Sequence, residues 1–136
     1  MDATRAFLIL SAVIGLMQAS EALLLQKSRG RLTCPAVLFS LIESLWAIPC
    51  AAALLGALDV RVPTFLPLSF VLYCVVGWAY GLLMLKPAPE EAAKEAAQNP
   101  AVPALSDFKM YPAYILSALL FGAYFCGTSL FLLSQR

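Results

Sequence analysis

The sequence predicts an all-α polytopic membrane protein, and its composition and two long uncharged stretches are the evidence. Hydrophobic residues make up 62% of the 136 residues and charged residues 12%, about half the charged share of a soluble domain. The 24 residues between Arg61 and Lys86 and the 26 between Lys109 and Arg136 carry no charge. Each stretch exceeds the roughly 20 residues that cross a bilayer. We therefore expect residues 1–136 to form a single transmembrane domain.

Two further apolar stretches, nearer the N-terminus, each contain one acid. Residues 6–26 are interrupted only by Glu21, and residues 32–58 only by Glu43. Proline stands at three of the expected helix starts, where its missing N–H costs little. The four predicted transmembrane helices, with short antiparallel connections, cover about 6–25, 35–58, 64–85 and 111–134.

A longer polar loop, 86–110, connects the third and fourth predicted helices. Together with the short loop 27–31 it places six lysines and arginines on one side of the membrane, against three on the other side. Lysine and arginine accumulate on the cytoplasmic side of membrane proteins. We therefore expect both loops on the cytoplasmic or matrix side and both termini on the opposite side, in a mitochondrial or bacterial inner membrane.

The two intramembrane acids are the most specific feature of the sequence. At about 1.5 Å per helical residue, Glu21 lies roughly 6 Å from the inner end of its helix and Glu43 about 12 Å from the start of the next one. Because the two helices are antiparallel, both acids fall in the same half of the membrane. Gln18 shares the helix face of Glu21, and Ser40 and Ser44 share that of Glu43. These five residues form a predicted polar seam between the first two helices.

The sequence leaves three roles open for this seam. Two adjacent carboxylates cannot both ionise at low cost, so they could share a proton and couple transport to it. Alternatively, Glu21 could reach Lys27 or the lipid headgroups while a protonated Glu43 forms an interhelical hydrogen bond. Glu43 could also face a positive group on another subunit.

Small residues recur at intervals of four on three of the predicted helices, a spacing that lets helices approach closely. The rows could serve packing within the chain or contact with a partner. They consist of Ser11, Gly15 and Ala19; Gly77 and Gly81; and Ala118, Gly122 and Cys126. Aromatic residues within the spans could fill the core or line a groove for a bound lipid or quinone.

Several chemistries are disfavoured by the composition. The chain contains no histidine, the usual acid, base and metal ligand of enzymes. Its four cysteines are widely spaced, without the C-x-x-C pattern of zinc and redox sites. The net charge of +1 gives no electrostatic basis for binding nucleic acid. We therefore expect no catalytic residues, no metal and no cofactor.

The favoured hypothesis is a non-catalytic accessory subunit of a larger membrane complex, for instance a respiratory-type, energy-transducing one. Its partners would be membrane lipid and other membrane subunits. It rests on the absent catalytic pattern, the small-residue rows and the polar loop. The alternative is a small proton- or cation-coupled transporter that uses Glu21 and Glu43. An enzyme acting on a lipid-soluble substrate is a third hypothesis.

Overall fold

The computed structural model describes residues 2–29, 34–84 and 112–136. The helices in these ranges are α1 (Ala3–Lys27), α2 (Cys34–Leu54), α3 (Phe65–Met84) and α5 (Pro112–Ser134). Each of the four is long and apolar enough to cross a membrane. The predicted fold, an all-α membrane protein with four transmembrane helices, is thereby confirmed. The predicted polar loop 86–110 lies outside the described residues.

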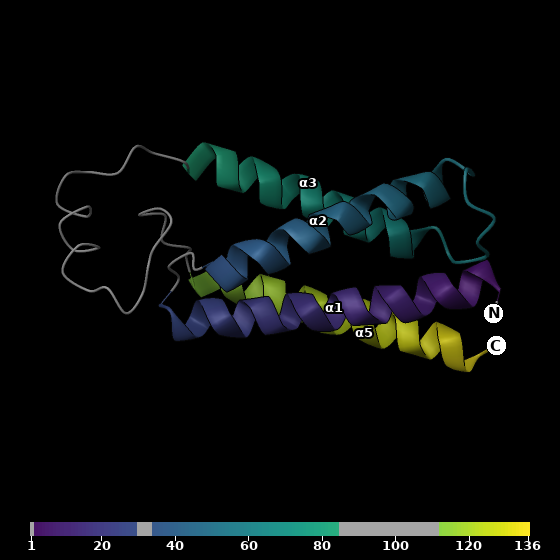
Figure 1. Cartoon of the computed structure of the whole chain (residues 1–136), viewed down its shortest axis with the longest axis horizontal. Coiled ribbons are helices and arrows are strands. Elements are labelled where there is room, and N and C mark those ends of the chain that lie inside the picture. The colour runs from purple at the N-terminus through teal and green to yellow at the C-terminus, as the bar shows by residue number, and fades with distance from the viewer. Residues whose placement is uncertain (1, 30–33, 85–111) are drawn as a thin grey trace, which may run out of the picture.

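The helices pack as two pairs (Figure 1). The antiparallel helices α1 and α5 lie side by side and make the most extensive contact in the bundle, and α2 and α3 form the second pair. α1 also contacts α2, whereas the contact between α3 and α5 is slight. Both chain termini lie at one end of the bundle (Figure 1), which we call the terminal end. α1 and α3 finish at the opposite end, which we call the loop end.

A side-chain cap explains why α1 begins three residues before the predicted boundary. The Asp2 carboxylate accepts a hydrogen bond from the backbone N–H of Arg5 at 2.7 Å, and so satisfies one of the donors that a first helical turn leaves unpaired. This hydrogen bond lowers the pKa of Asp2 below its usual value. The cap is therefore intact at neutral pH and is lost only as the pH falls through that lowered pKa.

A glycine explains why α2 ends at Leu54 rather than at residue 58. Gly56 has a φ of +72°, a left-handed conformation that glycine adopts without steric penalty. The N–H of Ala57 donates to the carbonyl of Ala52 at 2.8 Å, and the N–H of Gly56 donates to that of Ala53 at 3.3 Å. These are the two hydrogen bonds of a Schellman motif, which closes a helix at its C-terminus.

A close backbone approach joins α1 to α5. A Cβ atom added to Gly15 would lie 2.6 Å from the backbone nitrogen of Cys126, and one added to Gly122 would lie 2.7 Å from the backbone nitrogen of Ala19. Such distances are well inside van der Waals contact, so only glycine fits at either position. Each glycine belongs to one of the small-residue rows of the sequence, and the two rows meet at this interface.

Stacked rings, in contrast, separate α3 from α5. The rings of Tyr73 and Phe121 are almost parallel, with centroids 4.2 Å apart, and those of Tyr80 and Tyr114 stack at 4.6 Å. Rings that stand between two helix backbones occupy more room than glycines do. α3 therefore contacts α5 through side chains, while α1 contacts it through the backbone.

The terminal half of the bundle is filled by apolar side chains and tied together at its end. Buried core residues in this half include Phe7, Leu8, Leu66, Phe70 and Phe125. At the surface, the Arg136 side chain donates to the carbonyl of Arg61 at 2.6 Å, and the N–H of Arg61 donates to the hydroxyl of Thr4 at 2.9 Å. These bonds connect both ends of the chain to the segment between α2 and α3.

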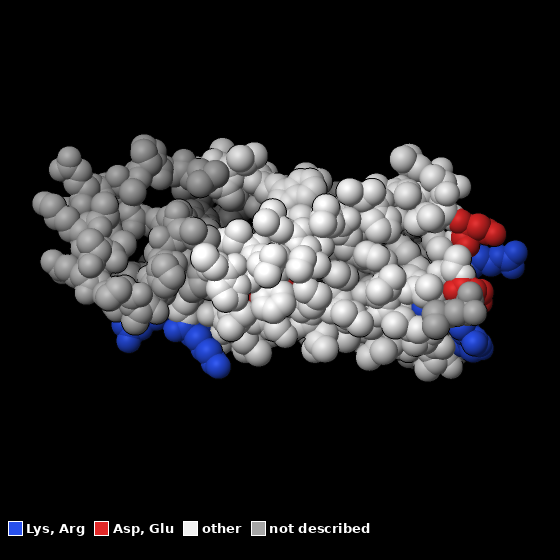
Figure 2. All heavy atoms as spheres, viewed as in Figure 1, with Lys and Arg blue, Asp and Glu red and all other residues white. Residues whose placement is uncertain are grey.

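The described charged side chains lie mainly at the two ends of the bundle (Figure 2). The surface between the ends is almost entirely uncharged in this view, and large apolar side chains are exposed along all four helices. An uncharged band of this kind matches the hydrocarbon core of a bilayer, which disfavours exposed charge.

Replacing Gly122 by alanine tests the α1–α5 contact. The added methyl group would overlap the α1 backbone, so we expect Gly122→Ala to lower the free energy of unfolding by about 1–3 kcal/mol. Gly127 lies five residues further along α5, with no atom of the described residues within 4 Å of an added Cβ. Gly127→Ala is the matched control. Alanine is favoured over glycine inside a helix by up to about 1 kcal/mol, so this variant should not lower the thermal unfolding temperature in detergent. Equal stability of the two variants would contradict the interface.

Candidate functional site: a cavity between the four helices

A cavity of about 550 Å³ lies between the helices in the half of the bundle nearer the loop end. All four helices contribute to its wall, through residues within 18–25, 37–44, 70–82 and 114–118. The buried ring of Phe70 lies at its inner limit, next to the apolar core of the terminal half. In the other direction the cavity reaches Leu25, Val37 and Leu82, near the loop end.

Glu21 and Glu43 meet in the wall of this cavity. Their carboxyl groups are close enough to hydrogen-bond to each other, and such a bond requires that one of them carries a proton. With α1 ending at Lys27 and α2 beginning at Cys34, the two acids lie about 9 Å and 14 Å from their helix ends at 1.5 Å per residue. The structure therefore places Glu21 against Glu43, at a depth within the membrane-spanning part of the bundle.

Two buried oxygens in the wall have no hydrogen-bond partner among the described residues. They are Oε1 of Glu43 and Oε1 of Gln18. The side chains are only 6% and 4% exposed, respectively, and both residues line the cavity. Both atoms are hydrogen-bond acceptors, and leaving a buried acceptor unpaired costs about 1–3 kcal/mol. The site therefore offers these two acceptors to whatever occupies the cavity.

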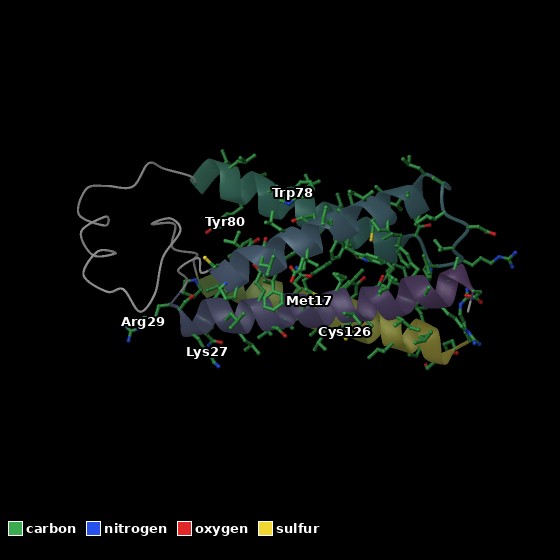
Figure 3. The ribbon with its side chains drawn as sticks, in the orientation of Figure 1. Met17, Lys27, Arg29, Trp78, Tyr80 and Cys126 are labelled. Atoms are coloured by element: carbon green, nitrogen blue, oxygen red, sulfur yellow. The ribbon has the colours of Figure 1, made fainter. Side chains whose placement is uncertain are left out.

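Aromatic groups of α3 and α5 form the facing wall. The Tyr73 hydroxyl lies next to the Gln18 side chain and to the Tyr114 hydroxyl. Trp78 lies on the side of α3 that faces α2 (Figure 3), and its indole N–H donates to the Ser44 hydroxyl at 3.0 Å. The aromatic faces of this wall can contact an apolar or a cationic ligand.

All five residues of the predicted polar seam line the cavity. Glu21 and Gln18 come from α1, and Glu43, Ser40 and Ser44 come from α2, so the two sets face the same space. The seam is also wider than the sequence suggested, because α3 and α5 complete it.

The small-residue rows separate into two groups. Gly15, Ala19, Gly122 and Cys126 lie at the α1–α5 contact, and Ser11 is buried beside it, where its hydroxyl accepts a hydrogen bond from the Trp46 indole at 3.3 Å. The remaining members line the cavity instead: Gly77, Gly81 and Ala118.

The G-x-x-x-G pair of α3 makes room for the cavity. In the described part of the chain, no atom comes within 4 Å of a Cβ added at Gly81, and only the Tyr114 hydroxyl does so at Gly77. No helix backbone of the described residues packs against either glycine, in contrast to Gly15 and Gly122. The spacing that suggests helix packing on α3 therefore accompanies an open wall.

Four lining residues of α3 and α5 lie outside the polar seam that the sequence predicts: Tyr73, Cys74, Trp78 and Tyr114. The three aromatic ones are among the residues for which the sequence left core packing and groove lining open. A signal for three of them exists, because Tyr73, Cys74 and Trp78 share a helix face with Gly77 and Gly81 at spacings of three and four. Apart from the Tyr73 hydroxyl and the Trp78 indole N–H, that face is as apolar as the rest of α3. Hydropathy alone could not distinguish it from a lipid-facing surface.

The described residues contain no group of three histidine, cysteine or acidic side chains arranged to hold a metal ion. The lining carboxyl groups number two, and the described part of the wall includes no lysine or arginine. The chemistry that the cavity offers is thus acid–base and hydrogen-bonding chemistry in an apolar setting.

Glu43→Gln separates a structural role of this acid from a functional one. No described N–H or hydroxyl donates to its Oε1, and a glutamine can still hydrogen-bond to Glu21. We therefore expect the free energy of unfolding to change by less than about 1 kcal/mol. Thermal unfolding in detergent, with Gly122→Ala as the destabilised reference, measures this. A loss as large as that of the reference would mean that Glu43 mainly holds the fold together.

Comparison with known proteins identifies no relative of this chain. No protein-family model matches the sequence, and no curated protein or solved structure is detectably similar to it. The function is therefore inferred from the cavity and the side chains that line it.

Proposed function

We propose that the protein is a small proton-coupled membrane carrier in which Glu21 and Glu43 exchange a shared proton for a solute. The observation that carries the proposal is the adjacent pair of carboxyl groups in the wall of a cavity inside a transmembrane bundle. Ionisable residues within membrane spans are costly to place and commonly mark proton or substrate pathways.

The two ends of the bundle differ in the way that a carrier requires. Apolar side chains and the hydrogen bonds around Arg61 close the terminal end, while the cavity extends from the middle of the bundle toward the loop end. Carriers bind their solute near the membrane midplane and expose the site to one side at a time. The arrangement resembles one of the two states of such a cycle.

The pair of acids supplies a coupling step. Two carboxyl groups in contact hold a proton more readily than either would alone, because ionising both places two negative charges side by side. A cationic or hydrogen-bond-donating solute that enters the cavity competes for the same oxygens. Release of the proton to one side and of the solute to the other would then link the two movements.

The accessory-subunit hypothesis remains a prediction with less support than before. Two of the three small-residue rows contribute to contacts within the chain at the α1–α5 interface, so they no longer argue for an external partner. Native mass spectrometry after extraction in mild detergent tests it. Co-purifying membrane subunits in fixed stoichiometry would favour it, and a monomer or homodimer would contradict it.

The expected orientation, with the loop end on the cytoplasmic or matrix side of an inner membrane, also remains a proposal. It rests on the lysines and arginines of the loops. In that orientation the cavity would open toward the cytoplasm or matrix.

Proton flux in proteoliposomes tests the carrier. Vesicles containing the protein and the trapped pH dye pyranine would be exposed in turn to inorganic cations, organic amines, organic anions, sugars and amino acids. We expect at least one class to drive proton movement, and we expect Glu21→Gln and Glu43→Gln to slow it about tenfold or more, since each removes half of the proton-binding pair.

The matched control is Asp59→Asn, which removes an exposed carboxyl group in the α2–α3 connection. Asp59 lies outside the cavity wall, so this variant should move protons as fast as the unaltered protein. Proton flux that is absent with every class, or that is equal in Glu43→Gln, would contradict the carrier.

A further inference from the structure

We propose that the cavity binds a protonated amine attached to an apolar, preferably aromatic, body. The inference rests on the proposed function in one respect: it names the class of solute that such a carrier would exchange for the proton. The binding site itself follows from the unpartnered acceptors, the charge and the shape of the wall.

The unpartnered groups specify hydrogen-bond donors on the ligand. Oε1 of Glu43 and Oε1 of Gln18 are both buried acceptors without a donor among the described residues. A ligand that carries only acceptors, such as a quinone, would leave both unpaired. A ligand with N–H or O–H groups satisfies them.

The charge of the wall specifies a cation. Glu21 and Glu43 both line the cavity, and no lysine or arginine of the described residues accompanies them. The other titratable groups that face the pair, Tyr73 and Cys74 of α3 and Tyr114 of α5, are uncharged at neutral pH. An alkylammonium group, which is protonated at neutral pH as lysine is, matches this excess of negative charge. Its N–H groups would form charge-assisted hydrogen bonds to the carboxylates.

The rest of the wall specifies an apolar body. Leu25, Val37, Leu41, Phe70 and Leu82 surround the polar groups. The volume of about 550 Å³ falls within the roughly 300–1,000 Å³ of small-molecule sites. Tyr73, Trp78 and Tyr114 add aromatic faces that attract an ammonium group as well as apolar carbon. The ligand is thus amphipathic, with its charged end at the two acids.

Three probes that share one phenylbutyl body separate the two requirements. 4-Phenylbutylammonium carries both a positive charge and N–H donors, its N,N,N-trimethyl derivative carries the charge without a donor, and 4-phenylbutanol carries a donor without the charge. Trp78 lines the cavity and is one of only two tryptophans in the chain. Fluorescence titration of the purified Trp46→Phe protein therefore reports on the cavity through Trp78 alone.

We expect the primary amine to bind at least about tenfold more tightly than either of the other probes, the ratio that one charge-assisted hydrogen bond provides. Glu43→Gln should reduce the affinity for the amine about tenfold while leaving that for the alcohol within about twofold. Asp59→Asn should change neither. Equal affinities of the three probes for the unaltered cavity would overturn the proposal, as would a Glu43→Gln effect that is the same for all of them.

The probe series with unaltered acids needs no substituted carboxyl group, so the proposal stays testable if Glu43→Gln does not fold. Gln18→Met, which removes one acceptor at similar volume, provides a second variant. It should weaken binding of the amine more than binding of its trimethyl derivative.

Failure of this proposal is distinguishable from failure of the carrier. Amine binding without any proton flux would contradict the carrier and support the amine site. Proton flux that depends on Glu21 and Glu43, without a preference for the amine, would support the carrier and contradict the amine site.

Discussion

The backbone contact between α1 and α5 is the constraint on which the rest of the bundle depends. Helices in lipid gain little from apolar burial, because the lipid tails are as apolar as the side chains, so they associate through close packing and hydrogen bonds. Gly15 and Gly122 bring α1 and α5 together until their backbones touch. Stacked rings such as Tyr73 on Phe121 keep α3 farther from α5. The unequal spacing leaves room between the two pairs, and this room is the cavity.

The cavity in turn explains how two acids can be placed within the spans. A carboxylate that faced lipid at the depth of Glu43 would be strongly disfavoured. Glu43 is buried inside the bundle instead and lies against Glu21, so one proton can serve both. The exposed faces of the same helices are apolar. Polar groups are therefore concentrated on the inner surface, where they can act on a ligand without destabilising the protein in the membrane.

The four helices and the similar depth of the two acids could be predicted from the sequence. That the acids face each other, and which residues complete the site, could not. Charge-free length identifies the spans, and a short antiparallel connection brings Glu21 and Glu43 to similar depth. The boundaries at Asp2 and Gly56 depend on local hydrogen bonds that hydropathy does not include.

The sequence does not show which helix faces pack against each other. The glycines of α3 and those of the α1–α5 contact have similar small-residue spacings, yet Gly81 lines open space and Gly122 lies against a backbone. The difference lies in what the facing helix presents. α1 presents small residues to Gly122, whereas α5 presents the Tyr114 hydroxyl to Gly77. The periodic apolar pattern of one sequence does not indicate which helices face each other.

The same packing contrast determines which helices could move in a carrier. Opening the terminal end while closing the loop end requires one pair of helices to tilt against the other. α1 and α5 cannot slide past each other without lifting Gly15 and Gly122 out of contact, so they would move as a unit. The α2–α3 pair is held to that unit by side chains: the apolar core of the terminal half, stacked rings, and single hydrogen bonds such as that from Trp46 to Ser11. The hydrogen bonds can break and re-form at little cost. Because Glu21 belongs to the fixed pair and Glu43 to the other, any such tilt would change the distance between the two carboxyl groups. Separating the two carboxyl groups weakens their binding of a shared proton. The rigid contact between α1 and α5 would in this way couple movement of the α2–α3 pair to release of the proton.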